Sequence, residues 1–217
     1  MGRRENQLRD LLGGSSDTKL AKPSTESFRA YDLDTEVHAV YRRLGGTLAN
    51  FPCRCGGYDI VVGDQAVELD EERHFNRYRA VTLESKLYQA LSNFPLERYK
   101  ALCAEREADC LKSAGYGGNW SNPSCERAFP GVPAPKQLTE PGPPRWRQRA
   151  FYDFLKDIFQ LAGGPAVWRV PIYDTLPVEE TSKSVGAILS KGTPQELTAL
   201  KNWLHARLSV APIHPAS

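Results

Sequence analysis

Three carboxylates lie in two neighbouring segments that both have the composition of β-strands. Residues 58–62 contain Asp59, and residues 66–70 contain Glu68 and Asp70, with a Gly-Asp pair between them that is typical of a hairpin turn. Residues two apart in a strand project to the same side, so Glu68 and Asp70 point together. If Asp59 faces them across the hairpin, the three carboxylates converge.

Carboxylates this close repel one another, and a divalent cation is the simplest compensation. An all-oxygen site suits Mg²⁺ or Mn²⁺, which can activate water and stabilise the transition state of phosphodiester hydrolysis. The structural alternative for Glu68 is a carboxylate paired with an arginine, and Arg169 on a later predicted strand is a candidate partner of the acidic cluster. Asp64, Glu71 and Glu72 fit a turn and a helix start, and we assign them no role.

The elements that must position these residues follow from hydrophobic periodicity and from Gly, Pro and capping signals. Residues 1–27 are polar apart from a short apolar run over 8–12 and are predicted to be a flexible arm with one or two helical turns, and residues 28–217 a single domain. The predicted elements, in chain order, are a helix over 35–44, strands over 58–62 and 66–70, a long helix over 71–93, an insertion over 95–144 with one helix near 96–113, a helix over 145–162, a strand over 166–170, and two C-terminal helices over 178–189 and 194–208.

Three of these predictions carry specific residues. The last predicted helix has Thr193 as N-cap before Pro194. The helix over 145–162 is expected to bury the apolar face formed by Trp146, Ala150, Phe154, Leu155 and Ile158. The long helix is expected to bury Phe75, Leu83, Leu87, Ala90 and Leu91. The insertion is rich in Gly, Pro and Cys. The fold class is therefore α/β, with the order helix, strand, strand, helix, insertion, helix, strand.

This order, with its acidic residues, resembles the restriction-endonuclease-like (PD-(D/E)xK) superfamily, whose signature is an Asp on one strand and Glu-x-Lys on the next. The run Val-Glu-Leu-Asp-Glu-Glu-Arg-His over 67–74 is most similar to the branch of very-short-patch repair endonucleases, which often have Glu-x-Asp-Gly with a His shortly after. It is also similar to an uncharacterised bacterial family with the hallmark Val-Glu-Leu-Asp-Glu-Glu-x-His-Phe-Asn-Arg-Tyr-Arg. The resemblance covers 35–93 and 145–171.

The resemblance implies a metal-dependent nuclease acting on DNA in restriction, repair or defence. Asp59 and Glu68 would hold Mg²⁺ or Mn²⁺, Asp70 would complete the site, and His74 would be a general base or phosphate contact. The chain departs from the signature at Asp70, which replaces the usual Lys and cannot supply its positive charge. A noncatalytic nucleic-acid-binding or complex-assembly protein on the same fold therefore stays open, as does an enzyme on an unrelated fold.

Cationic residues near the acidic strand are candidates for DNA contact. Arg73 and Arg77 are four residues apart and share one face of the predicted helix, and Arg149 belongs to a run that interleaves arginines with Trp146. The structural alternative for each is a solvated basic face.

The five cysteines, Cys53, Cys55, Cys103, Cys110 and Cys125, do not have the spacing of a zinc motif. A structural Zn²⁺ in the insertion stays an alternative to buried thiols.

The composition of the chain indicates its general class and its expected location in the cell. The chain has 217 residues, a net charge of +2 and 41% hydrophobic residues, which is typical of a soluble globular protein. It has no run of about 20 apolar residues, so we expect a cytoplasmic protein without membrane association. Cutting two DNA strands needs two sites, which makes a homodimer or a partner protein of a defence or repair system a reasonable expectation.

Overall fold

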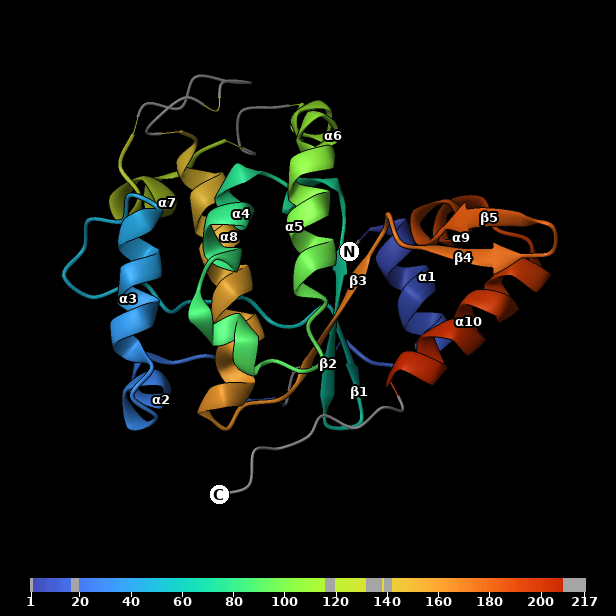
Figure 1. The fold of residues 1–217 in the computed structure, drawn as a ribbon, viewed down its shortest axis with the longest axis horizontal. Helices are drawn as coiled ribbons and strands as arrows, with labels where there is room; N and C mark the ends of the chain where they lie inside the picture. Colours follow the sequence, from blue (N-terminus) through green and yellow to red (C-terminus); the bar gives the residue numbers. More distant parts are fainter. Residues whose placement is uncertain (1, 17–19, 116–119, 132–137, 139–141, 209–217) are drawn as a thin grey trace. The chain divides into compact units, whose positions relative to one another are not determined.

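The computed structural model describes residues 2–16, 20–115, 120–131, 138 and 142–208 (Figure 1). Parts of the predicted arm (17–19) and of the predicted insertion (116–119, 132–137, 139–141) lie outside the described residues. The chain divides into two compact units, each built from segments that are far apart in the sequence. We call residues 1–21, 57–71 and 165–217 the sheet unit, and residues 22–56 and 72–164 the helical unit. Together they make a mixed α/β protein.

The sheet unit is built on three strands. These are β1 (Ile60–Val62), β2 (Gln65–Asp70) and β3 (Val167–Pro171), in the order β1-β2-β3. β1 and β2 form the predicted antiparallel hairpin, and Gly63 at its turn has a φ of 62°, which favours glycine. β3 runs parallel to β2, with Glu68 opposite Arg169. The predicted strands are thus confirmed, although Asp59 precedes β1 by one residue.

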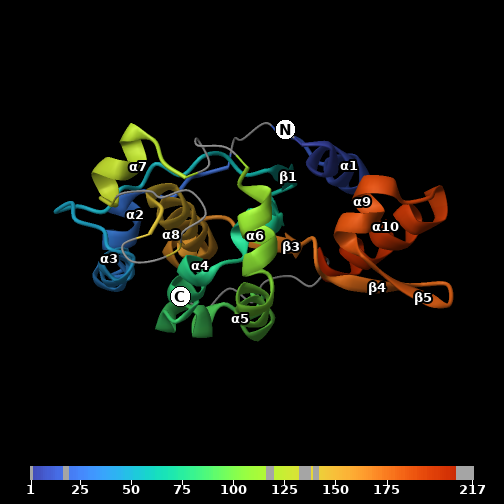
Figure 2. The same cartoon turned by 90° about the horizontal axis from the view of Figure 1, so that it is seen from above.

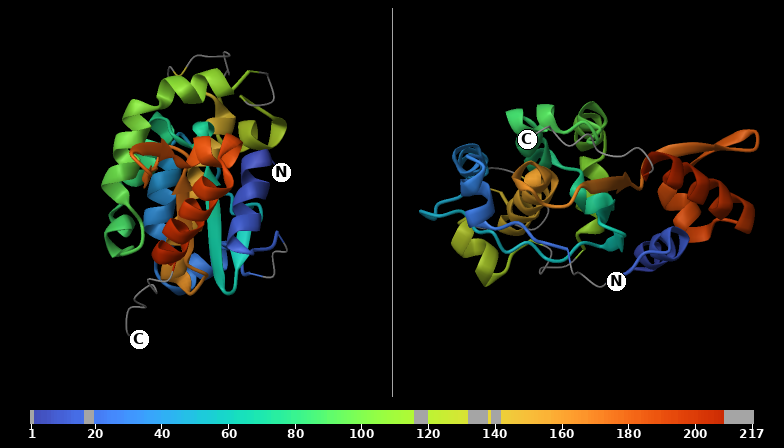
Figure 3. Two further views of the ribbon diagram at one scale, coloured as in Figure 1. Left: turned by 90° about the vertical axis from the view of Figure 1, so that its right-hand side faces the viewer. Right: turned by 90° about the horizontal axis from the view of Figure 1, so that it is seen from below.

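Three helices pack together in the same unit. They are α1 (Arg3–Leu12), α9 (Val185–Lys191) and α10 (Pro194–Leu208), and both views of Figure 3 show the blue α1 close to the red pair. Leu8 and Leu12 of α1 are buried in one hydrophobic core with Val67 and Leu69 of β2 and with Leu200 of α10. The predicted flexible arm therefore contains a helix whose apolar side contributes to the core.

The C-terminal region differs from the prediction in its first half. In place of a helix over 178–189, β4 (Thr175–Val178) and β5 (Thr181–Ser184) form an antiparallel hairpin before α9 begins (Figure 2). Alternate residues of β4 are buried, among them Leu176 and Val178, which is the period of a strand and not of a helix. The second predicted helix is confirmed as α10, and the Thr193 hydroxyl accepts a hydrogen bond from the Glu196 N–H, as an N-cap does.

The helical unit consists of short helices around one long one. Its elements are α2 (Thr25–Ala30), α3 (Asp34–Arg43), η1 (Glu72–His74), α4 (Arg77–Leu83), η2 (Lys86–Ala90), α5 (Leu96–Glu105), α6 (Glu107–Ser113), α7 (Pro123–Ala128), α8 (Pro144–Ile158) and η4 (Phe159–Ala162). The long helix α8 contacts α3, α4 and α7. The inward residues of its predicted apolar face are all buried: Trp146, Ala150, Phe154, Leu155 and Ile158. The helix predicted over 35–44 is confirmed as α3.

The single long helix predicted over 71–93 is wrong. The chain forms η1, α4 and η2 there, because polar side chains start a new helix within the stretch. The Asn76 side chain accepts hydrogen bonds from two N–H groups at the start of α4, and the Ser85 hydroxyl accepts one at the start of η2. As a result Ala90 is exposed, and Arg79 and Tyr88 are buried instead.

Within the described residues, no helix has the length and hydrophobicity that a membrane span requires.

Candidate functional site

Asp59 and Glu68 are held side by side in the sheet unit. Ile60 pairs with Val67 in the hairpin, so the next residues outward, Asp59 and Glu68, face each other. The Asp59 N–H donates a hydrogen bond to Glu68 Oε1 at 3.3 Å, and the Leu69 N–H donates one to Asp59 Oδ2 at 3.0 Å. Each carboxylate is thus fixed by the backbone beside the other one. We call Asp59 and Glu68 the acid pair.

The third predicted carboxylate, Asp70, is neutralised by an arginine. The parallel register places Arg169 opposite Glu68, and its Nη1 atom lies 2.7 Å from Asp70 Oδ1 and 4.0 Å from Glu68 Oε2. All three side chains are almost fully buried. The structural alternative, in which Arg169 is the partner of the acidic cluster, is confirmed. The prediction of a metal site with three carboxylate ligands is therefore wrong. In the described part of the chain, no group of three or more His, Cys, Asp or Glu residues is placed to hold a metal ion.

A further carboxylate comes from the segment predicted as the arm. Burial raises the pKa of Glu5, on α1, and the negative charges of Asp59 and, more weakly, Glu71 raise it further. Arg4 forms an ion pair with Glu71 at 3.4 Å. No local pattern in the sequence indicates this proximity, because it depends on the packing of α1 against the rest of the sheet unit.

The acid pair fits a small divalent cation by donor type. Mg²⁺ takes oxygen ligands and is commonly held by one or two carboxylates, with water and substrate phosphate completing its shell. A carboxylate that accepts one backbone hydrogen bond still has lone pairs for a cation. Asp59 and Glu68 therefore offer oxygen donors of the type that such an ion takes, while Asp70 is engaged by Arg169.

His74, at the end of η1 in the helical unit, forms a pair with an acid that the sequence analysis did not identify. Its Nδ1 lies 2.9 Å from Asp153 Oδ2, and its Nε2 lies 3.4 Å from Nη1 of Arg149. Because a guanidinium can only donate hydrogen bonds, this contact requires Nε2 to accept, with the proton on Nδ1 and directed to Asp153. An acid that orients a histidine in this way makes Nε2 the basic nitrogen.

Arginines surround this histidine pair. Arg149 is partly buried, and this burial lowers its pKa; Asp153 opposes the shift, while the nearby charges of Arg73 and Arg145 add to it. We call Arg73, Arg145 and Arg149 the basic cluster. The predicted DNA contacts Arg73 and Arg149 thus lie close to each other and to His74, and Arg145 joins them from the first turn of α8.

Arg77, the other predicted DNA contact, is engaged elsewhere. Its Nη2 and Nε atoms donate to the two oxygens of Glu107 at 2.7 and 2.9 Å, and its Nη1 donates to the Leu138 carbonyl oxygen. A bidentate pair of this kind uses the geometry that would otherwise bind a phosphate. Arg77 therefore has a structural role that the sequence did not indicate.

This ion pair gives a prediction for the dependence of stability on pH. The hydrogen bonds from Arg77 lower the pKa of Glu107 below its ordinary value of 4.5, so Glu107 stabilises the fold above pH 4.5 and loses this contribution as the pH falls through the lowered pKa. Glu107→Gln is expected to reduce the free energy of unfolding by about 0.5 to 1 kcal/mol near neutral pH and by much less in acid. Urea unfolding across the acid range measures this.

The control is Glu97→Gln, because the Glu97 side chain is 86% exposed and, among the described residues, contacts only Lys100, at 3.9 Å. If Glu107→Gln and Glu97→Gln lowered the free energy of unfolding equally at neutral pH, the ion pair between Arg77 and Glu107 would make no specific contribution to stability.

The cysteines do not form a metal group in the described part of the chain. Cys103, Cys110 and Cys125 lie on three different helices and are buried, and burial raises the pKa of Cys110 to about 12. Cys110 accepts a hydrogen bond from the Asn76 side chain, and Cys125 takes part in the cap of α7. The described residues therefore give the structural zinc no support.

Comparison with known proteins gives a family without a known activity. No curated protein and no solved structure matches the chain. The model of a family of unknown function, DUF7255, matches residues 39–191. This match includes Asp59, Glu68, His74 and Arg169 and covers well over half of the 217 residues. The chain therefore belongs to the DUF7255 family of unknown function.

Proposed function

We propose that this protein is a metal-dependent nuclease that hydrolyses phosphodiester bonds in DNA and has a restriction-endonuclease-like core. The observation that carries the proposal is the acid pair, in which backbone hydrogen bonds of 3.0 and 3.3 Å hold two carboxylates together at the open end of a hairpin. Two fixed carboxylates of this kind are a suitable ligand set for Mg²⁺ or Mn²⁺.

Each residue has a defined part in this proposal. Asp59 and Glu68 would hold the ion, which supplies a Lewis acid for the phosphate and lowers the pKa of a bound water. Arg169 neutralises Asp70 and keeps the Glu68 side chain in place. Within the helical unit, Asp153 and Arg149 hold His74, and the basic cluster offers positive charge for a phosphate.

The test compares cleavage of single- and double-stranded DNA by the purified protein with Mg²⁺, with Mn²⁺ or with EDTA. Glu68→Gln removes one charge from the acid pair and is expected to lower the cleavage rate more than about 100-fold, because a metal ligand contributes several kcal/mol to the transition state. Glu71→Gln is the matched control, since Glu71 is partly exposed and pairs with Arg4.

Circular dichroism and thermal unfolding establish that both variants fold. Equal cleavage by wild type and a folded Glu68→Gln variant would refute the proposal, as would cleavage that EDTA leaves unchanged.

A second candidate function is a noncatalytic nucleic-acid-binding or complex-assembly protein. The ion pair of Arg169 with Asp70 favours it, because the residue at the position of the usual Lys is then a buried structural acid. This candidate predicts DNA binding that depends on Arg73 and Arg149 and is indifferent to Mg²⁺ and to Glu68. Isothermal titration of Mg²⁺ separates the two, since a nuclease site requires metal binding that Glu68→Gln weakens.

A further inference from the structure

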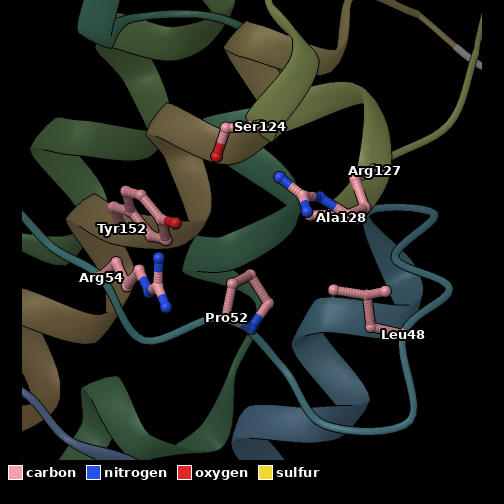
Figure 4. Close-up of a pocket in the computed structure, with 7 residues that line it drawn as sticks. All are labelled: Leu48, Pro52, Arg54, Ser124, Arg127, Ala128 and Tyr152. Carbon is pink, nitrogen blue, oxygen red and sulfur yellow. The ribbon is translucent and has the colours of Figure 1, made fainter.

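A cavity of about 280 Å³ lies within the helical unit, and none of its lining residues belongs to the acid pair or to the basic cluster. It is lined from three segments: the loop after α3, the helix α7 and the helix α8 (Figure 4). The lining residues are Leu48, Pro52, Arg54, Ser124, Arg127, Ala128 and Tyr152. Its volume is close to the lower limit of small-molecule sites, about 300 Å³, so a ligand of roughly mononucleotide size is the largest it encloses.

Hydrogen bonds tie the walls of this cavity together. The Tyr41 hydroxyl donates to the Ala128 carbonyl oxygen at 2.6 Å and accepts from the Leu48 N–H at 3.1 Å, which joins the loop to the end of α7. The Cys55 thiol lies 3.9 Å from the Tyr152 carbonyl oxygen, which joins the same loop to α8. The cavity is therefore held open by the fold and does not need a ligand to form.

Its charge is positive. Arg54 and Arg127 are exposed at its rim, and neither side chain forms a hydrogen bond or an ion pair with any other residue that the structure describes. No acid is among the lining residues, and the Glu126 carboxylate accepts a hydrogen bond from the Ser121 hydroxyl. Two guanidinium groups at one cavity attract an anion, and their planar donors match the oxygens of a phosphate.

Neutral donors and apolar surface complete the lining. Burial raises the pKa of Tyr152 to about 12, although a hydrogen bond with the Gln148 side chain opposes this shift, so the phenol keeps its proton and can donate to an anion. Ser124 adds a second hydroxyl (Figure 4). The Tyr152 ring, with the apolar side chains of Leu48 and Pro52, offers a surface on which a base or sugar can pack.

We propose that this cavity binds the phosphate group of a nucleotide, with Arg54 and Arg127 as its phosphate ligands. The base and sugar lie against Tyr152 and the apolar wall. The nucleotide is either free or part of a DNA strand, since both present the same phosphate chemistry. The proposal concerns residues of the helical unit alone and does not depend on the acid pair or on nuclease activity.

Isothermal titration of the full chain, without divalent cations, tests this binding with four probes. These are 5′-deoxyadenylate, deoxyadenosine, inorganic phosphate and a short oligodeoxyadenylate without terminal phosphates. Binding of deoxyadenylate and phosphate, but not of deoxyadenosine, is expected for a free nucleotide. If the oligonucleotide is the only probe that binds, the bound phosphate belongs to a DNA strand. Equal binding of deoxyadenosine and deoxyadenylate, or no binding of any probe, overturns the proposal.

The variant Arg54→Gln/Arg127→Gln removes both phosphate ligands at exposed positions. We expect it to weaken binding of the active probe by at least about tenfold, and up to about 100-fold, because hydrogen bonds to charged groups are lost. The matched control is Arg43→Gln/Lys112→Gln, which removes the same charge from side chains of the same unit that are 42% and 81% exposed and lie outside the cavity. An equal loss of affinity in the control would show that net charge alone attracts the probe, and the assigned site would be wrong.

Discussion

Replacing Arg169 with methionine is expected to lower the free energy of unfolding by about 3 to 5 kcal/mol, because two buried carboxylates lose their cation. The Arg169 side chain is fully buried, and its Nη1 lies 2.7 Å from Asp70 and within 4.0 Å of Glu68. Methionine preserves most of the volume of the arginine side chain, so the decrease in the free energy of unfolding measures the effect of removing the positive charge. Urea unfolding of wild type and variant gives the difference.

Two further measurements test whether Arg169 stabilises the protein by neutralising the buried carboxylates. Adding Asp70→Asn to Arg169→Met is expected to restore part of the stability, because the buried negative charge is then removed as well. Millimolar Mg²⁺ is expected to stabilise Arg169→Met more than wild type if the acid pair binds a cation. A loss below about 1 kcal/mol for the single variant would mean that the carboxylates are not held by Arg169 in solution.

The second large effect is expected from Asp157→Ala, in the core of the helical unit. Asp157 Oδ2 accepts hydrogen bonds from Arg79 at 2.5 Å and from the Tyr88 hydroxyl at 2.7 Å, and both charged side chains are almost completely buried. The Arg79 guanidinium also lies 5.7 Å from the ring centroid of Phe94 and 5.8 Å from that of Tyr99. Removing the carboxylate leaves a buried cation without its counterion, at a cost of about 3 to 5 kcal/mol.

Tyr88→Phe is the control for this prediction. It removes the hydroxyl, which donates to Asp157 and accepts from Arg79 Nη1, and preserves the ring that packs on Arg79, so we expect a loss of about 2 kcal/mol. Thermal and urea unfolding of both variants measures the difference. If Asp157→Ala lost no more stability than Tyr88→Phe, the buried ion pair would not be an important part of this core.

Both large effects arise from polar groups inside the protein and not from apolar packing. Arg79 follows Arg77 by two residues, yet Arg79 is buried against Asp157, while Arg77 is exposed and pairs with Glu107. Substitutions of these two arginines should therefore be interpreted as changes in stability before any loss of DNA binding is assigned to them.

Features encoded within a few residues were predictable from the sequence. The helix α3, the hairpin of β1 and β2 with its Gly-Asp turn, the apolar face of α8 and the Thr193 cap of α10 all follow from local periodicity, turn residues and caps. The same rules failed where two local signals competed. The apolar spacing over 71–93 fits a helix, but the Asn76 and Ser85 side chains start new helices within it.

The partners of the charged residues were decided by the tertiary structure. Arg169 meets Asp70 from 99 residues away, His74 meets Asp153 from 79 residues away, and Arg79 meets Asp157 from 78 residues away. The sequence by itself predicted the two strands of the hairpin and the turn between them, and the observed register, with Ile60 opposite Val67, decided that Asp59 faces Glu68. The sequence could name Arg169 only as a candidate partner, because the register of a parallel strand is set by the packing of the chain between the two strands and not by any local turn.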